Sequence, residues 1–129
     1  MSRPFKIVCV SGFFDPLHTG HIDYLRNARL LGDKLVVILN RDHQRNSRMV
    51  FNETDRKILI EAIRYVDEVV LCIDNDGSVC ESLKSLKPDI FAKGVDASES
   101  EKKICLVHKI QIVTQVGRHI HLQDLLCSL

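Results

Sequence analysis

The sequence predicts an α/β fold in which a Rossmann-like, doubly wound parallel sheet of five strands forms a single domain over residues 1–129. Short apolar runs alternate along the chain with segments of helical periodicity, and this alternation is typical of parallel sheets with right-handed crossovers. A chain of 129 residues has the usual size of one domain with a substantial core. No repeat or low-complexity segment suggests a further division.

Five apolar runs predict the strands. The first two are almost uninterrupted, as expected for strands that are covered on both faces of a sheet. A turn of aspartate, asparagine and glycine residues at 74–77 follows the third run. The predicted strands cover residues 5–10, 34–39, 68–73, 90–92 and 110–113.

Segments with apolar residues at helical spacing lie between and after these strands. The second of them has N-cap chemistry at 52–55 and apolar positions that continue to Val66. Gly32 is expected to end the first helix and Pro88 the third. The other predicted helices cover residues 19–31, 78–86, 98–108 and 119–127. The polar, basic stretch 41–52 has no period and predicts a functional loop.

Composition argues against several classes of protein. A formal net charge of +1 gives no reason to expect binding to nucleic acid or to a membrane surface. No apolar run approaches the roughly 18 residues of a membrane-spanning helix, and the N-terminus lacks a signal-peptide pattern. The five cysteines are odd in number and include no C-x-x-C pair, which indicates a reduced, cytoplasmic protein.

The most informative stretch joins the first strand to the first helix. The strand-like run stops at Gly12, and His18 and His21 stand on either side of Gly20 where the helix begins. Backbone N–H groups at a helix start are unpaired and favour anions, and side chains three positions apart share one helical face. Gly20 leaves room for a phosphate or ribose beside the backbone. The stretch therefore indicates a phosphate site.

Two other interpretations of the histidine pair are open at this point. The pair is then either a polar helix start without a ligand or half of a metal site. Zinc would need a third and a fourth ligand, and no nearby Cys or His has the required spacing. The strand, the glycine turn and the helix around the pair favour the phosphate site.

The same stretch resembles the H-x-G-H nucleotidylyltransferase superfamily. The nearest branch is the cytidylyltransferase-like group, which includes glycerol-3-phosphate cytidylyltransferase and the adenylyltransferase domain of the bifunctional heptose enzyme. The likeness continues in the first helix and second strand, in two arginine-containing segments, and in a Pro-Asp…Lys-Gly-x-Asp segment. These parts cover residues 24–33, 35–40, 56–59, 63–69 and 87–96.

The resemblance implies the strand order 3-2-1-4-5 and a reaction. The reaction is transfer of a nucleotidyl group from CTP or ATP to a small phosphorylated alcohol or sugar phosphate, with release of pyrophosphate. Mg²⁺ as cofactor and a homodimer are implied as well. The alternative is a catalytically weak nucleotide-binding or regulatory module of the same fold. It is motivated by residues 117–121, which read Gly-Arg-His-Ile-His where the family usually has Gly-x-Ser-Thr-Thr.

Such a reaction needs no covalent intermediate. A phosphate monoester is largely ionised at pH 7, so the acceptor attacks the α-phosphorus without a general base. The protein has to position two anions and stabilise the charge that grows at the α-phosphoryl group and the leaving oxygen. His18 and His21 are expected to donate hydrogen bonds to phosphate oxygens, and His18 matches the family's more critical histidine.

The resemblance assigns a role to each further site residue. The catalytic candidates are His18, His21 and Arg56, and Arg64 is expected to bind the acceptor. Asp15 either caps the turn structurally or holds Mg²⁺ or a cationic partner. The segment from Lys93 to Asp96 lines either the nucleobase or the acceptor pocket. The residues expected to bind the nucleotide are Gly12, Phe13, Phe14, Asp15, Gly20, Arg45, Arg48, Lys93, Gly94, Asp96, Gly117, Arg118 and His119.

Overall fold

A five-stranded parallel sheet is the centre of the computed structural model, which describes residues 4–45 and 47–117. The strands pair in the order β3-β2-β1-β4-β5, and every neighbouring pair is parallel. The strands are β1 (Ile7–Gly12), β2 (Lys34–Leu39), β3 (Glu68–Leu71), β4 (Ile90–Ala92) and β5 (Gln111–Val113). The predicted α/β class and the order 3-2-1-4-5 are confirmed.

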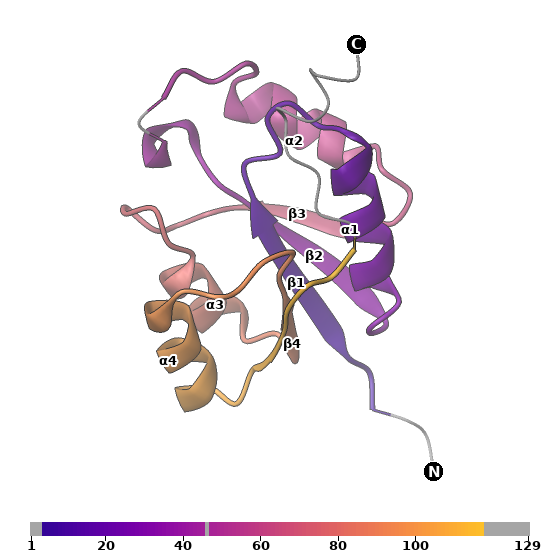
Figure 1. Ribbon diagram of the computed structural model, residues 1–129, viewed down its shortest axis with the longest axis vertical. Helices are drawn as coiled ribbons and strands as arrows, with labels where there is room; N and C mark the ends of the chain where they lie inside the picture. Colours follow the sequence, from indigo (N-terminus) through magenta and orange to yellow (C-terminus); the bar gives the residue numbers. More distant parts are fainter. Residues whose placement is uncertain (1–3, 46, 118–129) are drawn as a thin grey trace.

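In the part of the chain that the structure describes, two pairs of helices cover the sheet (Figure 1). One face carries α1 and α2, and the other carries α3 and α4. The helices are α1 (Thr19–Arg29), α2 (Glu53–Glu61), α3 (Cys80–Leu86) and α4 (Glu99–Val107), and a short 3₁₀ turn, η1 (Asp42–Gln44), follows β2. Within the described ranges, none of these helices has the length and apolar character that a bilayer crossing requires.

The alternation of side chains along β1 builds one core on each face. Val8 and Val10 pack with Leu25 of α1 and Ile60 of α2, whereas Cys9 belongs to the cluster that packs against α3 and α4. All three β1 residues are fully buried. The prediction of a strand covered on both faces is therefore confirmed for β1.

The end of α2 differs most from the prediction. The helix stops at Glu61, although its apolar periodicity continues to Val66. Ile63 and Val66 still pack against the core, but they do so from the connection that leads to β3. Apolar spacing indicates which residues are buried and not whether they are helical. For this reason the predicted helix extends too far at its C-terminal end. The other predicted bounds within the described part lie within two residues of the observed ones, and the helix predicted at 119–127 lies outside it.

The order of the strands determines where a ligand can bind. The chain leaves β1 towards α1 on one face and leaves β4 towards α4 on the other, although β1 and β4 are neighbours in the sheet. Ligands of open α/β sheets bind at such a switch point, beyond the carboxyl ends of the strands. The residues that follow Gly12 and Ala92 are therefore the first place to look for a site.

Candidate functional site

A pocket of about 420 Å³ opens beyond the carboxyl end of β1. Its volume falls within the range of about 300–1,000 Å³ that small-molecule sites occupy. Its lining residues come from the turn after β1, the start of α1 and the loop after β2: Phe13, Phe14, Asp15, Pro16, His18, His21 and Arg45. All except Pro16 were predicted to be site residues, so the structure brings most of the expected catalytic end together.

The two histidines cap the first turn of α1 reciprocally. His18 is the N-cap residue, and its Nδ1 accepts a hydrogen bond from the backbone N–H of Gly20 at 3.1 Å. His21 is the third residue of the helix, and its Nδ1 accepts from the backbone N–H of His18 at 3.2 Å. This is the geometry of a capping box, with imidazoles in place of a hydroxyl and a carboxylate. The spacing of the motif thus has a local structural cause.

These hydrogen bonds determine where each neutral imidazole carries its proton. A ring nitrogen that accepts a hydrogen bond from a backbone N–H bears no hydrogen itself. Because Nδ1 is the acceptor in His18 and in His21, the proton of each neutral ring is on Nε2. The pocket is therefore lined by two imidazoles that can each donate one hydrogen bond from Nε2.

The pKa values of both histidines are lowered. Burial, together with the adjacent His18, lowers the pKa of His21 to about 4. Burial also lowers the pKa of His18. The two rings are stacked, with centroids 3.8 Å apart and planes 21° from parallel, so two positive charges would repel strongly. Both histidines are consequently neutral donors at pH 7 in the absence of a ligand.

Asp15 supports the loop after β2. Its carboxylate accepts hydrogen bonds from the backbone N–H groups of Val50 at 2.6 Å and Phe51 at 2.8 Å, and Arg45 approaches it at 3.4 Å. The Asp15 side chain is fully buried. Both predicted alternatives are met in part: the carboxylate holds loop backbone, and it pairs with a cationic partner, Arg45. Both carboxylate oxygens therefore already have partners within the protein.

The described residues that line this pocket offer no unpaired carboxylate as a ligand for a magnesium ion. Asp15 is the single acidic lining residue, and its two oxygens are engaged. Across residues 4–45 and 47–117, no three His, Cys, Asp or Glu side chains are grouped so that they could hold a metal ion. The described residues therefore do not fit a resident Mg²⁺ site.

Arg56 is a buried support and not a surface cation. Its guanidinium is fully buried and donates to the carbonyls of Phe13, Asn40 and Phe51 at 2.8–3.0 Å. It also donates to the carboxylate of Asp42 at 2.6 Å. These contacts give Arg56 a structural role, and its predicted catalytic role stays a prediction. The residue joins the segments that follow β1 and β2 to the start of α2.

Arg45 is a cation that lines the same pocket as the two histidines. Its guanidinium carbon lies 5.6 Å from the centroid of the Phe13 ring, and its Nε donates to Ser47 Oγ at 2.7 Å. About a third of the Arg45 side chain (34%) is exposed, so the guanidinium can still contact a ligand. Arg48 is exposed on the same loop but does not line the pocket. Of the two loop arginines predicted to bind the nucleotide, the structure brings only Arg45 to the histidines.

The segment after β4 lies at the same edge of the sheet but outside this pocket. Lys93 pairs with the buried Glu101 at 3.5 Å, and its ammonium nitrogen lies 5.4 Å from the centroid of the Phe91 ring. Gly94 is partly buried and Asp96 is exposed. The choice between nucleobase and acceptor for this segment stays a prediction.

Gly117 and Tyr24 connect α1 to the half of the sheet that contains β4 and β5. Gly117 has φ +77°, and a Cβ at this position would come within 2.8 Å of the Tyr24 Cα. The hydroxyl of Tyr24 donates to the carbonyl of Ala92 at the end of β4, at 2.5 Å. Nothing in the sequence motif pointed to Tyr24. The predicted nucleotide contacts of Arg118 and His119 lie outside the described residues.

Arg64 lies at the opposite edge of the sheet. It precedes β3, at the amino ends of the strands, and its guanidinium donates to the hydroxyl of its neighbour Tyr65 at 3.1 Å. Within one chain, the structure therefore does not bring Arg64 to the histidine pocket. The prediction that it binds the acceptor came from resemblance alone, and the position before a parallel strand explains the separation.

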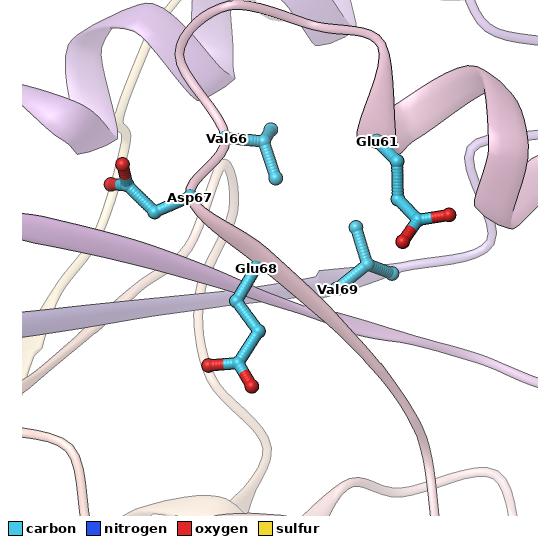
Figure 2. Close-up of a pocket in the computed structure, with 5 residues that line it drawn as sticks. All are labelled: Glu61, Val66, Asp67, Glu68 and Val69. Carbon is cyan, nitrogen blue, oxygen red and sulfur yellow. The ribbon is translucent and has the colours of Figure 1, made fainter.

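A smaller hollow of about 220 Å³ lies between the end of α2 and the start of β3 (Figure 2). It is lined by Val66, Val69 and three acidic residues from the end of α2 and the start of β3. All three carboxylates are paired: Asp67 with Arg29 and Glu68 with Lys34, both at 3.1 Å, and Glu61 with Lys57 at 4.0 Å. The hollow is remote from the switch point and contains no cation for a phosphate, so the histidine pocket is the better candidate site.

The parallel sheet and the H-x-G-H pocket define an α/β domain of the nucleotidyltransferase class. The chain belongs to the cytidylyltransferase-like family, whose model matches residues 9–124. It is 45% identical over 99 residues to an FAD synthase of Pyrococcus abyssi, covering 74% of this chain and 66% of that protein. It is 42% identical over 101 residues to the bifunctional protein HldE of Helicobacter pylori, covering 74% of this chain and 21% of that protein.

A solved structure has the same fold. The lipopolysaccharide core biosynthesis protein from Thermoplasma volcanium GSS1 superposes with a TM-score of 0.76 at 30% identity, covering 90% of this chain and 100% of that chain. The chain spans about a fifth of the length of the HldE relative and about two thirds of the Pyrococcus FAD synthase. The predicted membership of the H-x-G-H superfamily is confirmed.

Proposed function

We propose that the chain transfers a nucleoside monophosphate from ATP or CTP to a small phosphorylated acceptor and releases pyrophosphate. The observation that carries this proposal is the pair of neutral imidazoles with Nε2–H donors that cap α1 and line the pocket together with Arg45. A helix N-terminus, two donors and one cation suit a polyphosphate chain.

In the proposed step, an oxygen of the acceptor phosphate attacks the α-phosphorus of the nucleotide. A new P–O bond forms, the bond from the α-phosphorus to the bridging oxygen breaks, and pyrophosphate leaves with the electron pair. His18 and His21 donate to the oxygens on which charge accumulates, and Arg45 offsets the charge of the second anion. Donors already oriented by the caps need no rearrangement as the charge develops.

ATP is the donor that we favour. The relatives named FAD synthase are named for a product that contains an adenylyl group, and they align with about three quarters of this chain. The acceptor is assigned by class only: a phosphorylated alcohol, sugar phosphate or comparable phosphate monoester. We assign magnesium to the triphosphate itself, whose oxygens and bound water can satisfy the ion without a protein carboxylate. A homodimer and a cytoplasmic location remain predictions.

A pyrophosphate-release screen tests the proposal. Each nucleoside triphosphate is combined with a panel of phosphate monoesters in the presence of Mg²⁺, and the product is identified by mass spectrometry. We expect turnover for at least one pair, lost in His18→Ala and kept in His108→Ala, whose histidine caps the end of α4. Nucleotide binding without turnover for any pair would instead favour a binding or regulatory module.

A further inference from the structure

Phe14 has an unusual backbone conformation for a large side chain. Its φ is +51°, in the left-handed region that bulky residues seldom adopt. Strain of this kind persists only where the surroundings over-determine it, and it is concentrated at functional sites. The surroundings do so here: Arg56 holds the preceding carbonyl of Phe13 at 2.8 Å, and the following Asp15 is bonded to the loop at Val50.

This conformation sends the Phe14 ring against His21. The ring centroids lie 5.0 Å apart at 65°, an edge-to-face arrangement. The His18 ring is stacked on the His21 ring with centroids 3.8 Å apart, so the His21 ring contacts both the Phe14 ring and the His18 ring. Gly12 makes room for this packing, because a Cβ there would lie 3.1 Å from the Phe14 ring.

We propose that Phe14 is a positioning residue that holds the His21 ring in the orientation in which its Nε2–H serves the phosphate site. The inference rests on the proposed function. A single 3.2 Å hydrogen bond from the His18 N–H to Nδ1 cannot by itself fix the plane of the His21 ring, since rotation about the bond remains possible. The buried Phe14 ring, with 4% of its surface exposed, removes that freedom.

The charged and titratable groups around His21 do not replace this contact. His18 is stacked on the ring, and Asp15 and Arg45 line the same pocket. Asp15 is engaged by the loop and Arg45 by Phe13, Ser47 and Asp15. Removal of the Phe14 ring would therefore admit water to His21 and leave the His18 stack on one side of the ring and the Nδ1 hydrogen bond as the remaining constraints.

The test compares Phe14→Leu with Phe91→Leu. Phe91 is fully buried in the core on the other face of the sheet, so its substitution controls for a general loss of packing. Imidazole ¹⁵N NMR reports the tautomer and the titration midpoint of each histidine. In Phe14→Leu we expect a mixture of His21 tautomers and a midpoint raised by about one pH unit, a tenfold gain in proton affinity. In Phe91→Leu the His21 tautomer and its titration midpoint should both match those of the wild type.

Turnover gives a second readout. We expect kcat of Phe14→Leu to fall by about tenfold to 100-fold, with a smaller change in KM, because the donor is displaced. If Phe14→Leu does not fold, Gly12→Ala moves the same ring by adding a methyl group 3.1 Å from it. A wild-type His21 tautomer and midpoint in the folded variant would overturn the proposal. Absence of turnover for every substrate pair would contradict the proposed function and leave the NMR comparison valid.

Discussion

Two substitutions of His18 should separate its structural role from its chemical role. Its Nδ1 caps α1 through the Gly20 N–H at 3.1 Å, and its ring lines the pocket. Asparagine is among the best N-cap residues and offers an acceptor at the same place, but it has no imidazole. Alanine removes both the cap and the ring. His18→Asn therefore isolates the loss of the donor, and His18→Ala combines both losses.

The expected effects on stability follow from the cap. Loss of a good N-cap costs about 1 kcal/mol, within a range of roughly 0.5–2 kcal/mol. We expect the free energy of unfolding in urea to fall by this amount in His18→Ala and to change by less than about 0.5 kcal/mol in His18→Asn. The second cap, from the His18 backbone N–H to His21, is kept in both variants because it uses no side-chain atom of His18.

The expected effects on turnover follow from the donor. Removal of one positioned donor to a developing charge costs about 10²–10³ in kcat, or roughly 2.7–4 kcal/mol. Both variants should show this loss in a continuous pyrophosphate assay, although only His18→Ala is destabilised. Turnover of His18→Asn within a few-fold of the wild type would refute the assignment of Nε2–H as the donor. Equal stability of the two variants would refute the capping role.

Three further predictions concern the supports of the site. Arg56→Lys should cost about 3–5 kcal/mol in urea unfolding, because lysine cannot reach the acceptors that the buried guanidinium joins. Asp15→Asn should speed amide hydrogen exchange at Val50 and Phe51, whose N–H groups the carboxylate accepts; unchanged exchange would show that Asp15 does not hold the loop. The pKa of His21 is lowered to about 4 by burial and by its neighbouring histidine, whereas in the unfolded chain it is near 6.5. The unfolded state then binds more protons between these values, so the free energy of unfolding should fall as pH drops from about 6.5 to about 4. His21→Gln, which keeps a capping-box residue, should flatten that slope in urea titrations.

Most of the fold could be predicted from local pattern. The apolar run before Gly12 and the run at β2 are continuous because both strands are covered on two faces, and this made them easy to detect. The order of the strands came from resemblance, since periodicity carries no information about which strands pair. The end of α2 was overestimated because Ile63 and Val66 are buried from a turn.

The site could be predicted only where a motif specifies a position along the chain. His18 and His21 were identified because their spacing is local, and the pocket contains both. Arg56 and Asp15 were identified by type and place, but their partners come from other segments. Burial of the Arg56 guanidinium among three carbonyls depends on the packing of three loops, which no single stretch of sequence reports. Arg64 lies apart from the pocket within one chain for the related reason that its side of the sheet is a property of topology, and its acceptor role stays a prediction.

The capping geometry explains why this site uses histidine in particular. A capping box requires only acceptors at the N-cap and at the third helical residue, and serine with glutamate would meet that need. A glutamate would place a negative charge beside the incoming phosphates, and a serine has no second polar atom. An imidazole accepts a backbone N–H at one nitrogen and donates from the other. Under the proposed function, helix capping and phosphate recognition therefore favour the same residue type at His18 and His21, whereas either requirement alone would admit other residues.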